Sequence, residues 1–152
     1  KTSEFLIDDE TRTQMCRIAS EDFPKCQLCL IEFEREGKSY TVDTVTLLKE
    51  RYPNRNFAFA MGGDMFVYFK KWRKYEELIK MLSFFVFKRS ATDTREFDKV
   101  FEELTAEGMK IILKDEVIPA VSSTELRRDF EKSKHLLPEK VYYYLKDRGV
   151  YT

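Results

Sequence analysis

Short apolar runs alternate with helical patterns along most of this chain, and this alternation limits the possible folds more than any other feature. Strands that alternate with helices predict βα units, and therefore an α/β fold with a parallel sheet. The expected strands are the apolar runs at 27–34, 56–61, 84–88 and 110–113. The expected helices lie between Asp8 and Pro24, at 41–51, 65–71, 75–81 and 93–106, and between Pro138 and Gly149.

Polar junctions follow the expected strands, and ligands of parallel sheets bind past the carboxyl ends of the strands. Gly62-Gly63-Asp64 follows the strand at 56–61, where glycine lets a ligand approach the backbone and an acidic side chain can bind ribose hydroxyls. Lys88-Arg89-Ser90 follows the next strand. An ordinary strand-to-helix turn capped by Asp64 is the alternative at the first junction.

A third junction, Ser122-Ser123-Thr124, precedes a short helical pattern that contains Arg127 and Arg128. Hydroxyl side chains at this place cap a helix, and the amides of its first turn together with the helix dipole suit a phosphate. Arg127 lies about one turn further on, where its guanidinium could bind phosphate oxygens. An ordinary cap with solvated arginines is the alternative.

Composition limits the class of protein. The 152 residues correspond to one domain, and 27 basic residues balance 27 acidic ones, which argues against a protein that coats a polyanion. No apolar run reaches the roughly 18 residues of a membrane span, so we expect a cytoplasmic protein without a membrane partner. Three cysteines fit a reducing compartment; Cys26 and Cys29 lie in an extended-looking run, and we expect Cys16, Cys26 and Cys29 to be buried or half-buried thiols.

Several stretches, taken together and in order, carry a family resemblance. They are Ser39–Thr44, Met61–Asp64, Lys71–Leu78, the strand that ends at Lys88-Arg89, Val121–Arg127, and Leu137 through Tyr151. They resemble the nicotinate mononucleotide adenylyltransferases of bacterial NAD biosynthesis, which belong to the HxGH nucleotidyltransferase superfamily, and the likeness covers nearly the whole chain. It implies a Rossmann-like parallel sheet with flanking helices, in the strand order 3-2-1-4-5.

The resemblance implies transfer of the adenylyl group of ATP to nicotinate mononucleotide, with release of pyrophosphate and with Mg²⁺ on the phosphates. ATP phosphates would be held by the turn at 122–124 with Arg127, and Arg89 would face phosphate from the neighbouring strand end. Gly62 would approach the nucleotide and Asp64 would bind a ribose. The implied phosphate-binding residues are Ser122, Ser123, Thr124, Arg127 and Arg89.

The resemblance also implies a pocket for the pyridine ring, formed by Tyr40, Thr41, Trp72 and Arg73. Trp72 would stack on the ring, and backbone amides near Thr41 and Arg73 would meet a carboxylate. The alternative is that Trp72, the one tryptophan of the chain, fills the core. Preference for nicotinate over nicotinamide stays open, as does oligomeric state, including a homo-oligomer.

The chain departs from the family in one respect. The glycine-rich first strand and turn, whose histidines contact the transferring phosphates, is absent, and the only histidine, His135, is expected on a loop before the last helix. We therefore assign no catalytic residue. Because the chain also starts at Lys1, we expect residues 1–152 to be one nucleotidyltransferase domain that lacks its N-terminal segment with the first two strands.

Three other functions stay possible. The first is another adenylyl- or cytidylyltransferase, such as pantetheine-phosphate adenylyltransferase, against which the pyridine-pocket stretches argue. The second is a nucleotide-binding domain without activity. The third is nucleic-acid binding through the basic and aromatic residues at 69–75, which the balanced charge disfavours.

Overall fold

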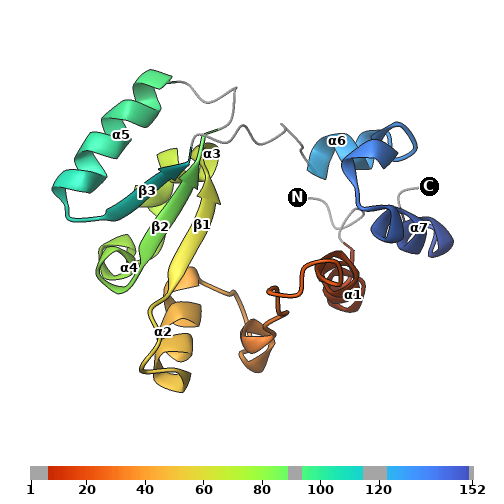
Figure 1. Ribbon diagram of the computed structural model, residues 1–152, viewed down its shortest axis with the longest axis horizontal. Coiled ribbons are helices and arrows are strands. Elements are labelled where there is room, and N and C mark those ends of the chain that lie inside the picture. The colour runs from red at the N-terminus through yellow and green to blue at the C-terminus, as the bar shows by residue number, and fades with distance from the viewer. Residues whose placement is uncertain (1–6, 89–93, 115–122, 151–152) are drawn as a thin grey trace. The chain divides into compact units, whose positions relative to one another are not determined.

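The computed structural model describes residues 7–88, 94–114 and 123–150 (Figure 1). They form two compact units. One unit combines the two ends of the chain, Lys1–Cys29 and Val121–Thr152, and the other is Leu30–Ala120. Each unit is described by itself below.

The Leu30–Ala120 unit is built on a sheet of three parallel strands in the order β1-β2-β3. In its register, Phe84 of the central strand lies between Phe59 and Ile111. The sheet confirms the predicted α/β class and three of the four predicted strands. The strands are β1 (Ala58–Gly62), β2 (Ser83–Phe87) and β3 (Lys110–Lys114).

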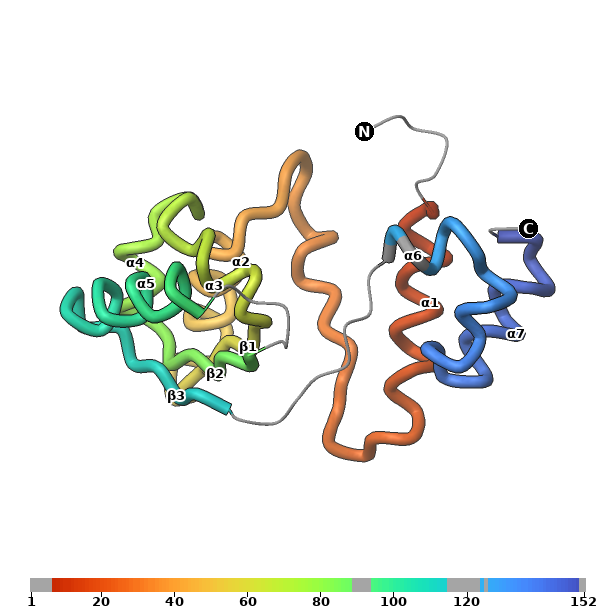
Figure 2. The backbone as a smooth tube through the Cα atoms, turned by 90° about the horizontal axis from the view of Figure 1, so that it is seen from above, coloured from red at the N-terminus to blue at the C-terminus, as the bar shows by residue number. Residues whose placement is uncertain are grey.

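The helices of this unit match the sequence pattern closely (Figure 2). Helices α2 and α4 have the predicted bounds at both ends. The segment predicted as one helix at 65–71 is instead two short ones that meet at Tyr68, where the backbone leaves the helical region (φ −94°, ψ 6°). The helices are α2 (Thr41–Arg51), α3 (Gly63–Val67), the 3₁₀ helix η3 (Phe69–Lys71), α4 (Tyr75–Met81) and α5 (Thr94–Ala106).

Aromatic side chains dominate the core of this unit. On β2, Phe84 and Val86 are fully buried while their neighbours are only half-buried, so one face of the sheet carries the core. The Phe69 ring packs on Phe84 with a centroid distance of 5.1 Å, and Phe66 packs on Phe97 at 5.0 Å. Each such side chain contributes roughly 1.5–3 kcal/mol by leaving water. The core therefore fixes where α3, η3 and α5 lie on the sheet.

The strand predicted at 27–34 is wrong. Residues Ile31–Glu34 form a 3₁₀ helix, η2, and only Ile31 is buried, whereas Phe33 is 55% exposed. A strand needs a neighbouring strand for its backbone groups, and among the described residues this segment pairs with none. Instead its acidic side chains bind α2: Glu34 pairs with Arg51 at 2.6 Å, and Glu32 accepts a hydrogen bond from Thr44.

The second unit is helical. Helix α1 starts where predicted, because the Asp8 carboxylate caps it by accepting a hydrogen bond of 2.7 Å from the Thr11 amide. Tyr142 is buried, stacks on Phe130, and donates a hydrogen bond of 2.7 Å to Glu131. The elements are α1 (Asp9–Ser20), α6 (Ser123–Arg128), the 3₁₀ helix η4 (Lys132–Leu136) and α7 (Glu139–Asp147).

His135 lies in η4 directly before α7, and not on an irregular loop as predicted. It is exposed, and its Nδ1 lies 2.9 Å from the Lys132 carbonyl oxygen. The longest described helix, α5, has 13 residues, which span about 20 Å at 1.5 Å per residue. In the part of the chain that the structure describes, no helix has both the length and the apolar character needed to cross a membrane.

The prediction of buried or half-buried thiols is wrong, since all three cysteines are exposed and free. For Cys26 and Cys29 the cause is the missing strand: the segment that was expected to be covered by a sheet runs in the open. Cys16 lies on α1, where the described residues leave its side of the helix uncovered. Nowhere in the described ranges do three His, Cys, Asp or Glu side chains gather to hold a metal ion.

Candidate functional site

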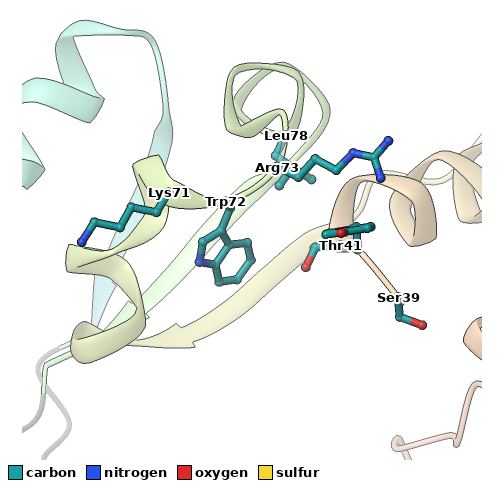
Figure 3. Close-up of a pocket in the computed structure, with 7 residues that line it drawn as sticks. Ser39, Thr41, Lys71, Trp72, Arg73 and Leu78 are labelled. Carbon is teal, nitrogen blue, oxygen red and sulfur yellow. The ribbon is translucent and has the colours of Figure 1, made fainter. Parts of the chain in front are cut away.

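The four residues predicted to form a pyridine pocket line one cavity. Tyr40 and Thr41 come from the start of α2, and Trp72 and Arg73 from the turn between η3 and α4 (Figure 3). The cavity has a volume of about 230 Å³. This is below the roughly 300–1,000 Å³ of a complete ligand site, and it suits one part of a nucleotide, such as a single ring. Its lining residues are Ser39, Tyr40, Thr41, Lys71, Trp72, Arg73 and Leu78.

Trp72 forms one wall and is held by the aromatic core. Its ring lies edge-on to Phe59 with a centroid distance of 5.6 Å, and tilted against Phe69 at 5.3 Å. It is nevertheless only half-buried, so part of the indole is left to the cavity. Trp72 therefore combines the two roles that the sequence left as alternatives: it packs against the core and it lines the pocket.

The start of α2 forms the opposite wall. Val42 and Val45 are buried and anchor the helix to the core. The amides of Asp43 and Thr44 both bond the Tyr40 carbonyl oxygen, at 3.0 and 3.2 Å. Tyr40 is the cap residue of α2 and makes no capping hydrogen bond with its side chain. The N-terminal end of a helix without a side-chain cap favours an anionic group, through its amides and its dipole.

Charged side chains surround this wall. The Arg73 guanidinium lies over the Tyr40 ring, 4.6 Å from its centroid, and its Nη1 is 3.8 Å from the Asp43 carboxylate. Arg35 is the second guanidinium near Asp43, and its Nη1 is 3.6 Å from the same carboxylate oxygen. Lys71 points elsewhere and lies over the Tyr68 ring at 4.7 Å.

Gly62 and Asp64 lie at the predicted place, past the carboxyl end of β1. Gly62 ends the strand and is the cap residue of α3, and its φ of −76° is one that any residue can adopt. Asp64 is exposed in the first turn of α3. The alternative that Asp64 caps this helix is wrong, because the cap residue is Gly62. Their nucleotide-binding roles stay predictions.

Of the predicted phosphate-binding residues, Ser122, Ser123, Thr124 and Arg127 fall in the sequence range of the helical unit, and Arg89 falls in that of the Leu30–Ala120 unit. Ser123 begins α6, Thr124 is exposed, and Arg127 is half-buried in the last turn. The predicted short helix is confirmed, but it begins within the hydroxyl residues, at Ser123, and not after them. Ser122 and Arg89 lie outside the described residues. No described contact tests a phosphate-binding role for any of them.

Two residues of the basic and aromatic stretch considered for nucleic acid, Phe69 and Lys70, have other roles in the structure. Phe69 is completely buried. Lys70 bridges Glu103 at 2.8 Å and Glu107 at 2.7 Å, and these hydrogen bonds raise the pKa of its ammonium group. A base could not stack on Phe69, and Lys70 already has two acidic partners.

Sequence reasoning did not assign a role to three lining residues, Ser39, Lys71 and Leu78. Ser39 and Lys71 precede assigned residues directly, so adjacency was the available signal. Leu78 is on α4 and nearly fully buried, which made it indistinguishable from a core residue. Asp43 lies in the matching stretch Ser39–Thr44 but was given no role, and Arg35 lies outside every matching stretch. Their contact joins the end of η2 to α2 through space, which a local pattern does not reveal.

Comparisons with known proteins show which family the chain resembles. No family model matches the chain. It is 37% identical to the nicotinate-nucleotide adenylyltransferase of Bacillus subtilis, over 99% of the chain and 76% of that protein. It is 34% identical to a probable nicotinate-nucleotide adenylyltransferase of Listeria innocua, over 96% of the chain and 72% of that protein.

Solved structures show the same fold. Nicotinic acid mononucleotide adenylyltransferase of Plasmodium falciparum superimposes with a TM-score of 0.73 at 22% identity, both in its complex with APC and in its complex with NaAD. The match covers 96% and 99% of the chain, and 77% and 78% of the two solved chains. With its Rossmann-like α/β sheet and its curated relatives, the chain belongs to the nicotinate-nucleotide adenylyltransferase family of nucleotidyltransferase enzymes.

Proposed function

We propose that the pocket between α2 and the turn after η3 holds the pyridine ring of nicotinate mononucleotide. The adenylyl group of ATP is transferred to the phosphate of the same mononucleotide. The reaction gives deamido-NAD and pyrophosphate in NAD biosynthesis, and it is the activity for which the relatives are named. The observation that carries this proposal is that Tyr40, Thr41, Trp72 and Arg73, from two separate stretches of sequence, line one cavity.

The pocket offers each part of the nicotinate ring a matching group. The half-buried Trp72 indole gives a flat apolar surface for stacking. The start of α2 gives amides and a positive dipole end for the ring carboxylate, beginning at Thr41. Stacking alone would accept many rings, and the helix start adds hydrogen-bond donors that the oxygens of a ring substituent can use.

The chemical step needs little from side chains that react. The phosphate of the mononucleotide attacks the α-phosphate of ATP in line, and pyrophosphate leaves, so positioning and charge neutralisation dominate. We propose that Ser123, Thr124 and Arg127 on α6, together with Ser122 and Arg89, bind the ATP phosphates. Asp64 would bind a ribose, with Gly62 allowing the nucleotide close approach.

Mg²⁺ would enter with ATP as its phosphate-bound partner. Magnesium keeps several waters and is usually bound by substrate phosphates and one or two carboxylates, so it needs no cage made by the protein. Bound there, it would neutralise charge on the leaving pyrophosphate. We assign no protein ligand to it.

The proposal can be tested directly, because Trp72 is the only tryptophan and therefore reports on the pocket without labelling. Titration with nicotinate mononucleotide is expected to quench its fluorescence to saturation, while ribose 5-phosphate, which lacks the ring, leaves it nearly unchanged. Calorimetry gives the affinity independently. If neither signal saturates, the pyridine assignment of the pocket is wrong.

Two competing functions are separated by two further measurements. Phosphopantetheine is expected neither to quench Trp72 nor to displace nicotinate mononucleotide; displacement would favour a different adenylyltransferase. Pyrophosphate release by the natural protein, supplied with ATP, Mg²⁺ and the mononucleotide, distinguishes an enzyme from a nucleotide-binding domain without activity.

A further inference from the structure

One carboxylate beside the pocket lies between two guanidinium groups. Asp43 Oδ2 is 3.6 Å from Arg35 Nη1 and 3.8 Å from Arg73 Nη1. Asp43 is in the first turn of α2, the same turn whose amides are proposed to receive the ring carboxylate. Taken alone, Asp43 would repel that carboxylate. The two arginines more than neutralise it, because they bring two positive charges to one negative charge.

Arg35 is committed to this structural role. Its side chain is 25% exposed, and its Nη2 donates a hydrogen bond of 2.8 Å to the Thr44 hydroxyl, which itself donates to Glu32. Arg35 therefore ties η2's end to α2 and balances Asp43. The positive charge that remains belongs to Arg73.

Arg73 has a different position. It lines the pocket, and its guanidinium lies over the ring of Tyr40, the cap residue of α2. The aromatic face and the Asp43 carboxylate together hold this cation beside the helix start. Figure 3 shows Arg73 and Thr41 from different elements at the same side of the hollow, with Trp72 as the separate wall.

We propose that the charge of Arg73 makes this pocket prefer a pyridine nucleotide whose ring carries a carboxylate over one whose ring carries a carboxamide. The inference rests on the proposed function, which places a pyridine ring here, and adds the side chain that selects its substituent. Backbone amides can donate to the oxygen of either substituent, so they discriminate weakly by themselves. A fixed cation interacts with the net charge, by which the two rings differ.

The expected effect is moderate. The Arg73 side chain is 52% exposed, so water and salt screen its charge. A charge of this kind changes affinity by roughly fivefold, not by orders of magnitude. The preference should also shrink as ionic strength rises.

The test compares the two mononucleotides on the same protein. Dissociation constants for nicotinate mononucleotide and nicotinamide mononucleotide are measured by Trp72 quenching at low salt. Arg73→Gln is expected to lower the preference for the acid about fivefold, by weakening the acid alone. Arg73→Lys keeps the charge and should retain most of the preference. Arg55→Gln is the matched control, since Arg55 also lies over a tyrosine ring, Tyr52 at 5.4 Å, past the other end of α2.

The outcomes separate this inference from the function on which it rests. If the unaltered chain binds neither mononucleotide, the proposed function fails and the inference with it. If the acid is still preferred to the same degree after Arg73→Gln, the inference alone is wrong. An equal loss for both mononucleotides would assign Arg73 to the phosphate that they share, and would also overturn it.

Discussion

The two regions assigned to substrates are held in place by different means. The pyridine pocket is carried by the Leu30–Ala120 unit, where Trp72 rests on the buried Phe69 and the start of α2 is anchored by buried Val42. The proposed phosphate-binding helix α6 has only six residues and belongs to the helical unit. The pocket wall therefore depends on packing in an aromatic core, whereas the unit that contains α6 has a smaller core and polar contacts between its other elements.

Those polar contacts are numerous in the helical unit. Lys146 and Tyr142 both donate hydrogen bonds to Glu131, and these bonds lower the pKa of that carboxyl. Arg148 donates to the Thr11 hydroxyl, which joins the end of α7 to the start of α1. We expect the two units to respond separately to core substitutions and differently to acid.

The largest expected effect is on the aromatic core. Phe69→Ala should lower the free energy of unfolding by about 3–5 kcal/mol, because it removes a fully buried ring that supports Trp72. Urea unfolding followed by Trp72 fluorescence measures it, and nicotinate mononucleotide binding should be lost at the same time. The contrasting substitution is Leu145→Ala in α7, which should cost about 2–5 kcal/mol in the helical unit. If Leu145→Ala abolishes pyridine binding as well, the two units are not independent.

The next effect concerns the phosphate-binding helix. Arg127→Ala should weaken ATP binding by about 1.5–3 kcal/mol, the size of a hydrogen bond to a charged group, and leave nicotinate mononucleotide binding unchanged. Calorimetry with each nucleotide separates the two. Arg128→Ala, one residue further and exposed, is the control. An unchanged affinity for ATP would return Arg127 to a structural role.

A comparable or smaller effect is expected in the pyridine pocket. Trp72→Ala should weaken nicotinate mononucleotide by about 1–3 kcal/mol, the range measured for stacking of a base on an aromatic side chain, while ATP affinity stays the same. Calorimetry is the measurement, since the fluorescent group is gone. Trp72→Phe should recover most of the loss. A loss of both nucleotides would contradict the division of labour between the regions.

The smallest effect is the acid response of the helical unit. Hydrogen bonds from the Thr11 amide and hydroxyl lower the pKa of Asp8 below its ordinary value of 3.8. Because the folded state binds the proton less readily, the ionised Asp8 carboxylate stabilises the folded state. This stabilisation is fully present above the ordinary pKa and is lost as the pH falls through the lowered pKa. Asp8→Asn should therefore be less stable than the parent near neutral pH, and the difference should close below about pH 3.8. Urea midpoints from far-UV circular dichroism, measured from pH 6 to 2.5, test it.

Local sequence patterns predicted correctly those elements whose secondary structure depends mainly on their own residues. The bounds of α2 and α4 follow from apolar spacing, and the strands β1 to β3 from short apolar runs. The prediction at 27–34 was wrong for a physical reason: its apolar content suits a strand, but a strand also needs a partner, which a local pattern does not contain. The exposed positions of Cys26 and Cys29 follow from the same error.

Sequence by itself determined the fold class, the family resemblance and the identity of four residues that form one pocket, because helical spacing, strand length and motifs are local properties. Only the tertiary structure decided that Trp72 serves core and cavity at once, and that Arg35 and Arg73 share the Asp43 carboxylate. Such contacts join residues that are distant along the chain, and they exist only after the aromatic core has set α2 and η3 beside each other.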